Sequence, residues 1–441
     1  MTTPLPTEFA QRRQRLMKTV GANAIIIVAS SPECLRNGDG HFPYRQDSDF
    51  YYLTGFSEPE AIAVLIPGRA QGEYILFNRP RDPAQETWTG RRAGQAGVTA
   101  NYGVNEAFPH DKFFEKLPEL ILDREKIYFA IGRDAEFDQK IIATINQLRN
   151  KVRLGVVAPS EYINLDPLLH EARLIKSTEE IALMRKAAQI SARGHIAAMQ
   201  ACRPGMYEYE LEAALLYEFY RQGSRAPAYN SIIGSGANSC ILHYNENCSP
   251  LVNGDLVLID AACEYQYYAS DITRTFPVNG RFSPEQRIIY DIVLASQLAA
   301  IDAVKPGNTL EDVHDVALRV LVEGLVKINI LKGNVDEIIE KKDYLLFFMH
   351  RTSHWLGLDT HDAGKYKLNN IWRPLQAGMV LTVEPGLYIS AELPGVDKKW
   401  WNIGVRIEDD ILVTEKGNEV LSKDAPKTIA DIEKLMKINP P

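Results

Sequence analysis

The chain has 441 residues, which is long for a single hydrophobic core, so two domains are expected. Its apolar content of 45% and charged content of 24% are those of an ordinary globular protein. A formal net charge of −8 argues against nucleic acid or an anionic membrane surface as the main partner. No apolar run approaches the length that crosses a bilayer, so no membrane partner is expected.

The amino-terminal twenty residues and the cysteines bear on the cellular compartment. The first twenty residues lack an apolar core, so no secretory signal is expected. The five cysteines are odd in number and show no paired spacing, which favours reduced thiols packed as small apolar side chains over a disulfide or thiolate site. Both features predict a cytoplasmic protein.

The first part of the chain alternates helical patterns with short apolar segments. The strand-like segments are residues 25–28, 61–66, 74–77 and 126–130. This alternation predicts a smaller α/β domain with a partly parallel sheet over residues 1–173. Residues 157–167 are interpreted as the connector. A capping-box sequence at residues 177–180 then opens a long helix that we expect to run to about Ala201.

Two acids follow strand-like segments in the second part of the chain. A turn signal at residues 253–255 precedes an apolar run that ends at Asp260. A second turn is expected near residues 263–265, and the alternating segment 269–276 places Asp271, Thr273 and Thr275 on one face. If the two segments pair antiparallel, both carboxylates lie close together. Buried like charges at that spacing are costly unless a cation holds them.

A second pair of acids repeats this arrangement. Gly254 precedes Asp260 by six residues, and Gly378 precedes Glu384 by the same six across another apolar run. Glu408 follows on an alternating segment, on the same face as Arg406. Pro-Gly breaks at residues 204–205 and 306–307 each separate two helical patterns. We therefore expect two related halves, each supplying two acids.

The four acids and one histidine suit a pair of metal ions. A single acid at a strand end is usually a turn former or a solvated charge. Two matched pairs are different, because their joint burial has no cheap explanation other than bound cations. Two adjacent divalent metals can share a water and convert it to hydroxide near neutral pH. The predicted ligands are Asp260, Asp271, His354, Glu384 and Glu408.

Three further histidines lie near these ligands: His243, His350 and His361. We expect them to donate hydrogen bonds and carry protons. His350 and His354 are four residues apart, as in a zinc-binding helix, but that motif needs a glutamate where Arg351 stands. Residues 353–358 also alternate, so a strand or extended loop is as compatible as a helix. His195 and His314 lie in helical patterns and are expected to be core or surface residues.

These residues together carry a family resemblance. The segments around His243, Asp260, Asp271, residues 350–362, residues 384–386 and residues 406–410 resemble the pita-bread metallopeptidases. With residues 44–56 and Trp88, the chain resembles the aminopeptidase P family over nearly its whole length. The resemblance implies α/β and α+β architecture. A smaller amino-terminal α/β domain, residues 1–173, would serve substrate access and oligomer contacts. A carboxy-terminal pita-bread domain, residues 174–441, would contain pseudo-two-fold duplicated halves.

The resemblance also implies an activity. It implies a metal-dependent aminopeptidase that hydrolyses the bond between any N-terminal residue and a following proline, through a hydroxide bridging two manganese ions. The implied partners are peptides with proline in second position, and the implied assembly is a homotetramer.

The resemblance assigns roles residue by residue. Asp271 and Glu408 would be the bridging ligands. His243, His361 and Glu384 would be catalytic: His243 stabilises the oxyanion, His361 donates a proton to the departing prolyl nitrogen, and Glu384 relays the proton of the water. The substrate-binding residues would be His350, Tyr388, Arg406, Asp39 and Trp88. The last two would narrow the site around the free amine, partly from a neighbouring subunit.

The chain departs from the family pattern at one position, and two alternative functions remain open. The family usually has a small residue after His350, whereas this chain has Arg351. A cation there could close the pocket toward longer substrates or pair with an acid on them. A prolidase, which cleaves only Xaa-Pro dipeptides, would share every metal ligand. A non-catalytic pita-bread binding protein is the other alternative, although such relatives normally lose ligands, and here all five are present.

Overall fold

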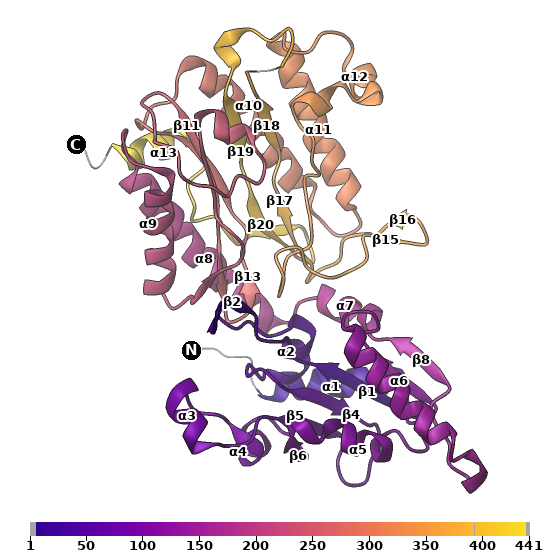
Figure 1. Ribbon diagram of the computed structural model, residues 1–441. Helices are drawn as coiled ribbons and strands as arrows, with labels where there is room; N and C mark the ends of the chain where they lie inside the picture. Colours follow the sequence, from indigo (N-terminus) through magenta and orange to yellow (C-terminus); the bar gives the residue numbers. More distant parts are fainter. Residues whose placement is uncertain (1–5, 392, 438–441) are drawn as a thin grey trace. The chain divides into compact units, whose positions relative to one another are not determined.

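The computed structural model describes residues 6–391 and 393–437 (Figure 1). The chain divides into two compact units, Met1–Ala172 and Arg173–Pro441. Among the described residues, no helix combines the length and the apolar character that crossing a bilayer requires.

The amino-terminal unit is built on a six-stranded sheet in the order β6-β5-β4-β1-β7-β8. Its strands are β1 (Ala24–Ala29), β4 (Ile62–Leu65), β5 (Tyr74–Asn78), β6 (Glu106–Pro109), β7 (Lys126–Phe129) and β8 (Glu161–Asn164). Strand β1 pairs parallel with β7 and antiparallel with β4, so the predicted partly parallel sheet is confirmed. The helices are α1 (Pro6–Val20), α2 (Ser48–Thr54), α3 (Pro83–Thr89), α4 (Gly94–Asn101), α5 (Phe113–Leu120), α6 (Ala135–Arg149) and α7 (Asp166–Leu174). A short hairpin joins β2 (Leu35–Asn37) to β3 (Gly40–His41).

Burial in the core of this unit explains why some strands could be predicted from the sequence and one could not. The central strands are continuous apolar runs because both sheet faces are covered, and Ile25, Ile75 and Phe77 are fully buried. The interpretation of residues 157–167 as a connector is wrong. Strand β8 lies within them and pairs parallel with β7 at the sheet edge. Its side chains are only partly buried, so it lacks the apolar signature of the central strands.

The second unit contains the predicted duplication. Its first half comprises α8 (Thr178–Ala201), α9 (Glu208–Arg221), β9 (Ala226–Pro227), β10 (Ile232–Ser235), β11 (Leu256–Asp260), β12 (Cys263–Tyr265), β13 (Tyr268–Ala269) and β14 (Thr273–Pro277). Its second half comprises α10 (Pro284–Ala303), α11 (Leu310–Lys327), α12 (Val335–Lys341), β15 (Lys367–Leu368), β16 (Ile371–Trp372), β17 (Val380–Val383), β18 (Gly386–Ile389), β19 (Ile403–Arg406), β20 (Asp409–Val413), β21 (Asn418–Val420) and α13 (Ile429–Met436). Figure 1 shows α9 and α11 on opposite sides of the central strands.

The two halves share one strand plan. In the first half, β11 pairs antiparallel with β14, and the hairpin β12–β13 lies between them in sequence. In the second half, β17 pairs antiparallel with β20, and β18–β19 takes the place of the hairpin. Each half begins with two helices separated by a Pro-Gly break. The pseudo-two-fold duplicated architecture is therefore confirmed.

Local signals account for several element boundaries. Ser177 and Glu180 form the predicted capping box, and α8 runs to Ala201 as expected. The turn expected near residues 263–265 is misplaced, because those residues form β12 and the turn is made by Gln266 and Tyr267. Both residues have positive φ, at 50° and 72°. A turn of this kind normally contains glycine, and neither residue is a glycine, so the turn has no signal in the sequence.

A candidate metal centre between the duplicated halves

The four predicted acids occupy equivalent places in the two halves. Asp260 is the last residue of β11 and is in register with Thr273 on β14, whereas Asp271 lies two residues before that strand. Glu384 directly follows β17, and Glu408 directly precedes β20. Each half thus places one acid at the carboxyl end of the earlier strand of this antiparallel pair and one shortly before the later strand. The antiparallel pairing brings the two acids of each half together.

These acids and His354 converge on one region. The ligand atoms of Asp271, His354 and Glu408 all lie within 4.8 Å of one another. His354 Nε2 is 3.4 Å from Asp271 Oδ2 and 3.7 Å from Glu384 Oε1. Asp260 is connected to Asp271 through a shared tyrosine hydroxyl, described below. The structure therefore gathers all five predicted ligands.

His354 reaches the centre from an extended segment rather than a helix. Trp355 forms an isolated antiparallel bridge with Leu381, and the amide of Thr382 donates to the His354 carbonyl at 3.0 Å. The segment thus runs alongside β17. His354 Nδ1 hydrogen-bonds to the carbonyl of Trp355 at 3.0 Å, which leaves Nε2 facing the carboxylates. Because this segment is extended, His350 and His354 do not form the paired-histidine helix of zinc peptidases.

Burial makes the carboxylates depend on a positive charge. Burial raises the pKa of Asp260, raises the pKa of Glu384 to about 7, and raises the pKa of Glu408 well above its usual value. Burial alone would lower the pKa of His354, but the hydrogen bond to Asp271 and the charge of Glu384 raise it to about 9. Burial therefore disfavours the charged form of these carboxylates, and a bound cation would offset that cost. Oxygen donors of this number, with one imidazole nitrogen, fit two divalent cations.

A chain of hydrogen bonds joins three predicted substrate-binding residues to the cluster. Arg406 Nη2 donates to Asp260 Oδ2 at 2.7 Å, and Nη1 donates to the Tyr388 hydroxyl at 2.9 Å. The same hydroxyl is 2.8 Å from His350 Nε2. All of Arg406 is buried, and strand β19 holds its backbone against β18. The three side chains therefore form one continuous wall attached to a predicted ligand.

Two residues that were not predicted as site residues, Tyr229 and Thr273, hydrogen-bond to the acids. The Tyr229 hydroxyl lies 2.7 Å from Asp260 Oδ1 and 2.6 Å from Asp271 Oδ1. Burial raises the pKa of Tyr229, so its phenol stays neutral. Thr273 Oγ1 donates to Glu408 Oε2 at 2.7 Å. A lone tyrosine before a short strand carries no sequence signal. Thr273, in contrast, shares the predicted face of Asp271.

The remaining predicted residues lie at the solvent side or in the other unit. His243 and His361 are exposed. The ring centroid of His361 is 4.4 Å from that of His354, and burial together with His354 lowers the pKa of His361. In the amino-terminal unit, Asp39 lies in the turn between β2 and β3. Trp88 lies on α3 with 86% of its surface exposed.

Arg351, the departure from the family pattern, is engaged within the chain. Its guanidinium pairs with Glu311 on α11 and lies 5.2 Å from the ring centroid of Trp372. The charge that could pair with an acid on a substrate is therefore already balanced by Glu311 of the same unit.

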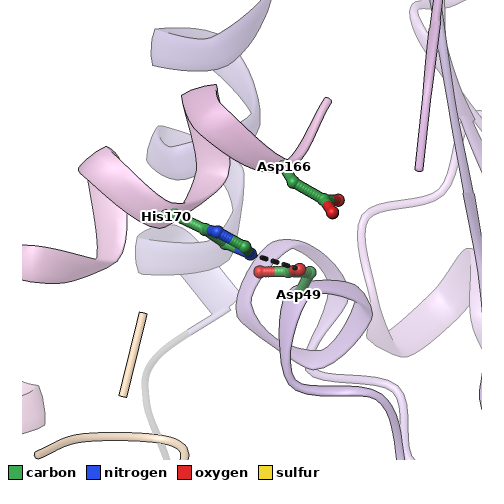
Figure 2. Close-up of side chains that lie close together, drawn as sticks. All are labelled: Asp49, Asp166 and His170. Carbon is green, nitrogen blue, oxygen red and sulfur yellow. Dashed lines mark ion pairs between the residues drawn. The ribbon is translucent and has the colours of Figure 1, made fainter. Parts of the chain in front are cut away.

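A second acid–histidine cluster lies in the amino-terminal unit, and Figure 2 shows its members Asp49, Asp166 and His170. Arg133 Nη2 lies 2.7 Å from Asp49 Oδ2 and 3.1 Å from Asp166 Oδ1. It also lies 3.4 Å from His170 Nε2. A guanidinium thus balances these acids already, so this cluster is an ion-pair network rather than a metal site.

Comparisons with known proteins agree with the geometry. The profile of metallopeptidase family M24 matches residues 182–415, and that of the aminopeptidase P N-terminal domain matches residues 9–128. The chain is 48% identical over 432 residues to the Xaa-Pro aminopeptidase of Escherichia coli, with 97% of both proteins covered. It superimposes on aminopeptidase PepP of Pseudomonas aeruginosa with a TM-score of 0.98, 51% identity and 99% of both chains covered. It superimposes on E. coli aminopeptidase P with the inhibitor Pro-Leu at a TM-score of 0.94, 47% identity and 98% of both chains. The chain therefore belongs to metallopeptidase family M24, and its M24 domain follows an aminopeptidase P amino-terminal domain.

Proposed function

We propose that this protein is an Xaa-Pro aminopeptidase, a metal-dependent exopeptidase that cleaves the bond between an N-terminal residue and a following proline. The observation that carries this proposal is the convergence of five oxygen and nitrogen donors in a chain similar to an Xaa-Pro aminopeptidase over 97% of its length. Those donors are Asp260, Asp271, His354, Glu384 and Glu408.

We propose that these donors would hold two divalent cations, namely Mn²⁺, with Asp271 and Glu408 proposed as ligands of both. When bound, the cations supply Lewis acidity and lower the pKa of water toward neutrality. The carboxylate-rich donor set supports manganese, since hard oxygen ligands suit it better than soft-metal alternatives.

The wall formed by His350, Tyr388 and Arg406 is proposed to bind and recognise the proline ring of the substrate. An Xaa-Pro bond has no N–H, so hydrogen bonding to the backbone amide is impossible and the ring itself must be recognised. Burial raises the pKa of Tyr388 to about 12, which keeps its hydroxyl a neutral partner of Arg406 and His350. Arg406, fixed at Asp260, orients this wall relative to the proposed ligands.

Three residues are proposed to handle protons and charge during hydrolysis. His361, which is exposed beside His354, is proposed to donate a proton to the departing prolyl nitrogen. His243 is proposed to donate a hydrogen bond to the carbonyl oxygen as it gains negative charge. Glu384 is proposed to accept the proton of the attacking water and return it later in the reaction.

The two parts of the chain are proposed to divide the work. Residues 174–441 form the catalytic pita-bread domain, and residues 1–173 serve substrate access and oligomer contacts. Asp39 and Trp88 are proposed to narrow the site around the free amine, partly from a neighbouring subunit of a homotetramer. The high exposure of Trp88 supports such a contact. A cytoplasmic location is proposed from the five unpaired cysteines.

A comparison of peptide lengths tests this function. We expect purified protein with Mn²⁺ to release the first residue of an Arg-Pro-Pro tripeptide, and chelation to abolish that release. Activity restricted to an Xaa-Pro dipeptide would identify a prolidase instead. Metal binding without hydrolysis of either peptide would point to a non-catalytic binding protein.

A further inference from the structure

Helix α11 contacts two of the three residues that separate His350 from His354. Glu311 pairs with the guanidinium of Arg351 at the surface. One turn further along, His314 Nδ1 lies 2.8 Å from Thr352 Oγ1 in the interior. The first contact is half exposed and the second is buried. These two contacts connect α11 to the segment that delivers two of the predicted active-site histidines.

Thr352 transmits this contact to the metal centre. Its side chain is fully buried and faces His314, while its carbonyl accepts a hydrogen bond of 2.8 Å from the amide of Glu384. Two residues on, the carbonyl of His354 accepts from Thr382 on β17. Thr352 thus begins the pairing that places His354 and Glu384 side by side. A shift at Thr352 would move both predicted ligands.

His314 is a buried polar group with a restricted environment. It is 6% exposed, and its ring centroid lies 5.7 Å from that of Phe348, which lies 4.8 Å from that of His350. Burial, together with the charge of Arg351, lowers the pKa of His314 to about 4, so the ring is neutral at pH 7. A neutral imidazole at this depth requires a hydrogen-bond partner, and Thr352 provides one.

The duplication offers an independent parallel. His314 follows the Pro-Gly glycine Gly307 by seven residues, and Glu212 follows Gly205 by the same seven. Glu212 Oε2 accepts from Asn247 Nδ2 at 3.2 Å, and Asn247 Oδ1 accepts from the amide of Ile233 on β10 at 2.9 Å. Strand β10 flanks β11 as the His354 segment flanks β17. The same helix position therefore secures the outer strand in both halves.

We infer that His314 is a positioning residue for the hydrolysis, acting through the Thr352 hydroxyl on His354 and Glu384. This inference rests on the proposed function. The Arg351–Glu311 pair is the natural comparison, because an exposed ion pair of this kind contributes little. The role of α11 therefore depends on the buried hydrogen bond rather than on the surface charge beside it.

The test compares near-isosteric variants at Thr352. Thr352→Val removes the hydroxyl and keeps the shape, whereas Thr352→Ser retains the hydroxyl. His314→Leu removes the other partner, and Glu311→Gln is the control for the exposed pair. We would measure kcat and KM on an Xaa-Pro-Xaa tripeptide per metal-loaded site, Mn²⁺ affinity by calorimetry, and the unfolding temperature.

We expect Thr352→Val and His314→Leu to lower kcat per loaded site by about tenfold, the effect of one lost buried hydrogen bond, with KM nearly unchanged. The double variant should be no slower than either single variant, because both remove one interaction. Thr352→Ser and Glu311→Gln should stay within about twofold of the unmodified protein, since the hydroxyl is retained in one and only an exposed pair is lost in the other.

Several results would overturn the inference. A normal kcat per loaded site in Thr352→Val, with only a lower unfolding temperature, would show a purely structural role. Multiplying losses in the double variant, or a loss in Glu311→Gln as large as that in Thr352→Val, would also contradict it. If the unmodified protein cleaves no Xaa-Pro peptide, the proposed function fails. The calorimetric arm then still tests the contact, with Mn²⁺ affinity expected to fall about tenfold in Thr352→Val but not in Thr352→Ser.

Discussion

The two duplicated halves of the second unit each supply two acids from equivalent positions, but the side chains that surround these acids differ between the halves. Asp260 and Glu384 lie at the carboxyl ends of β11 and β17, and Asp271 and Glu408 shortly precede β14 and β20. The outer segments diverge. The chain leading to β10 supplies the neutral hydroxyl of Tyr229, whereas the segment beside β17 supplies the imidazole of His354.

This difference suggests how a duplicated fold acquires a directional site. The shared strand plan produces a nearly symmetric set of carboxylates, which suits a pair of like cations. The second half alone adds the wall of His350, Tyr388 and Arg406 together with the exposed His361. Symmetry thus serves cation binding, and asymmetry is proposed to serve substrate orientation.

Replacing a bridging acid tests the equivalence of the halves with the largest expected effect. Asp271→Ala and Glu408→Ala should each abolish binding of both cations and lower turnover by about a thousandfold or more, because each acid is proposed to serve both ions. Metal content and peptide hydrolysis measure this. Glu415→Ala, at an exposed turn acid, is the control. Full metal content in only one of the two variants would show that the halves are not equivalent.

Replacing His361 tests the residues that only the second half adds to the site. His361→Ala should leave metal content intact and lower kcat by about a hundredfold, the usual loss when a positioned proton donor is removed. Metal analysis and steady-state kinetics on the same preparation separate binding from proton transfer. An unchanged kcat would remove His361 from the mechanism.

The buried histidine of the first half predicts a pH dependence of stability. Burial lowers the pKa of His195 to about 3, whereas an unfolded histidine titrates near 6.5. As the pH falls below about 6.5, the unfolded chain binds a proton that the folded chain does not, so stability is lost toward acid. Between pH 7.5 and 5 the loss is about 2 kcal/mol. Denaturant unfolding of the wild type and His195→Gln at both pH values measures it. An equal slope in both proteins would exclude His195 as the cause.

Removing the Tyr229 hydroxyl, which only the first half supplies, has the smallest expected effect of these substitutions. Tyr229→Phe should weaken Mn²⁺ binding by about tenfold, since it removes one buried hydrogen bond to Asp260 and Asp271 without removing a ligand. Calorimetry with Mn²⁺ measures the change. His354→Ala, the corresponding change in the second half, should instead abolish binding of the cation that His354 is proposed to hold. Similar effects of both substitutions would mean that the hydroxyl is itself a ligand.

Much of the fold could be predicted from local patterns. The central strands of the amino-terminal sheet and the capping box at Ser177 carry strong signals, because continuous apolar runs and side-chain caps depend on near neighbours. Strand β8 and the turn at Gln266 could not be predicted. An edge strand lacks the apolar run, and a positive-φ turn without glycine has no local signature.

The amino-acid sequence by itself determined the two pairs of acids, the equal spacing of Asp260 from Gly254 and of Glu384 from Gly378, and the family resemblance. Only the tertiary structure decided what surrounds them: the Tyr229 hydroxyl between Asp260 and Asp271, the extended path of His354, and the contact of His314 with Thr352. The physical reason is the separation along the chain. Strand periodicity acts over a few residues, whereas a hydrogen bond between residues 38 positions apart exists only once helices and strands have packed.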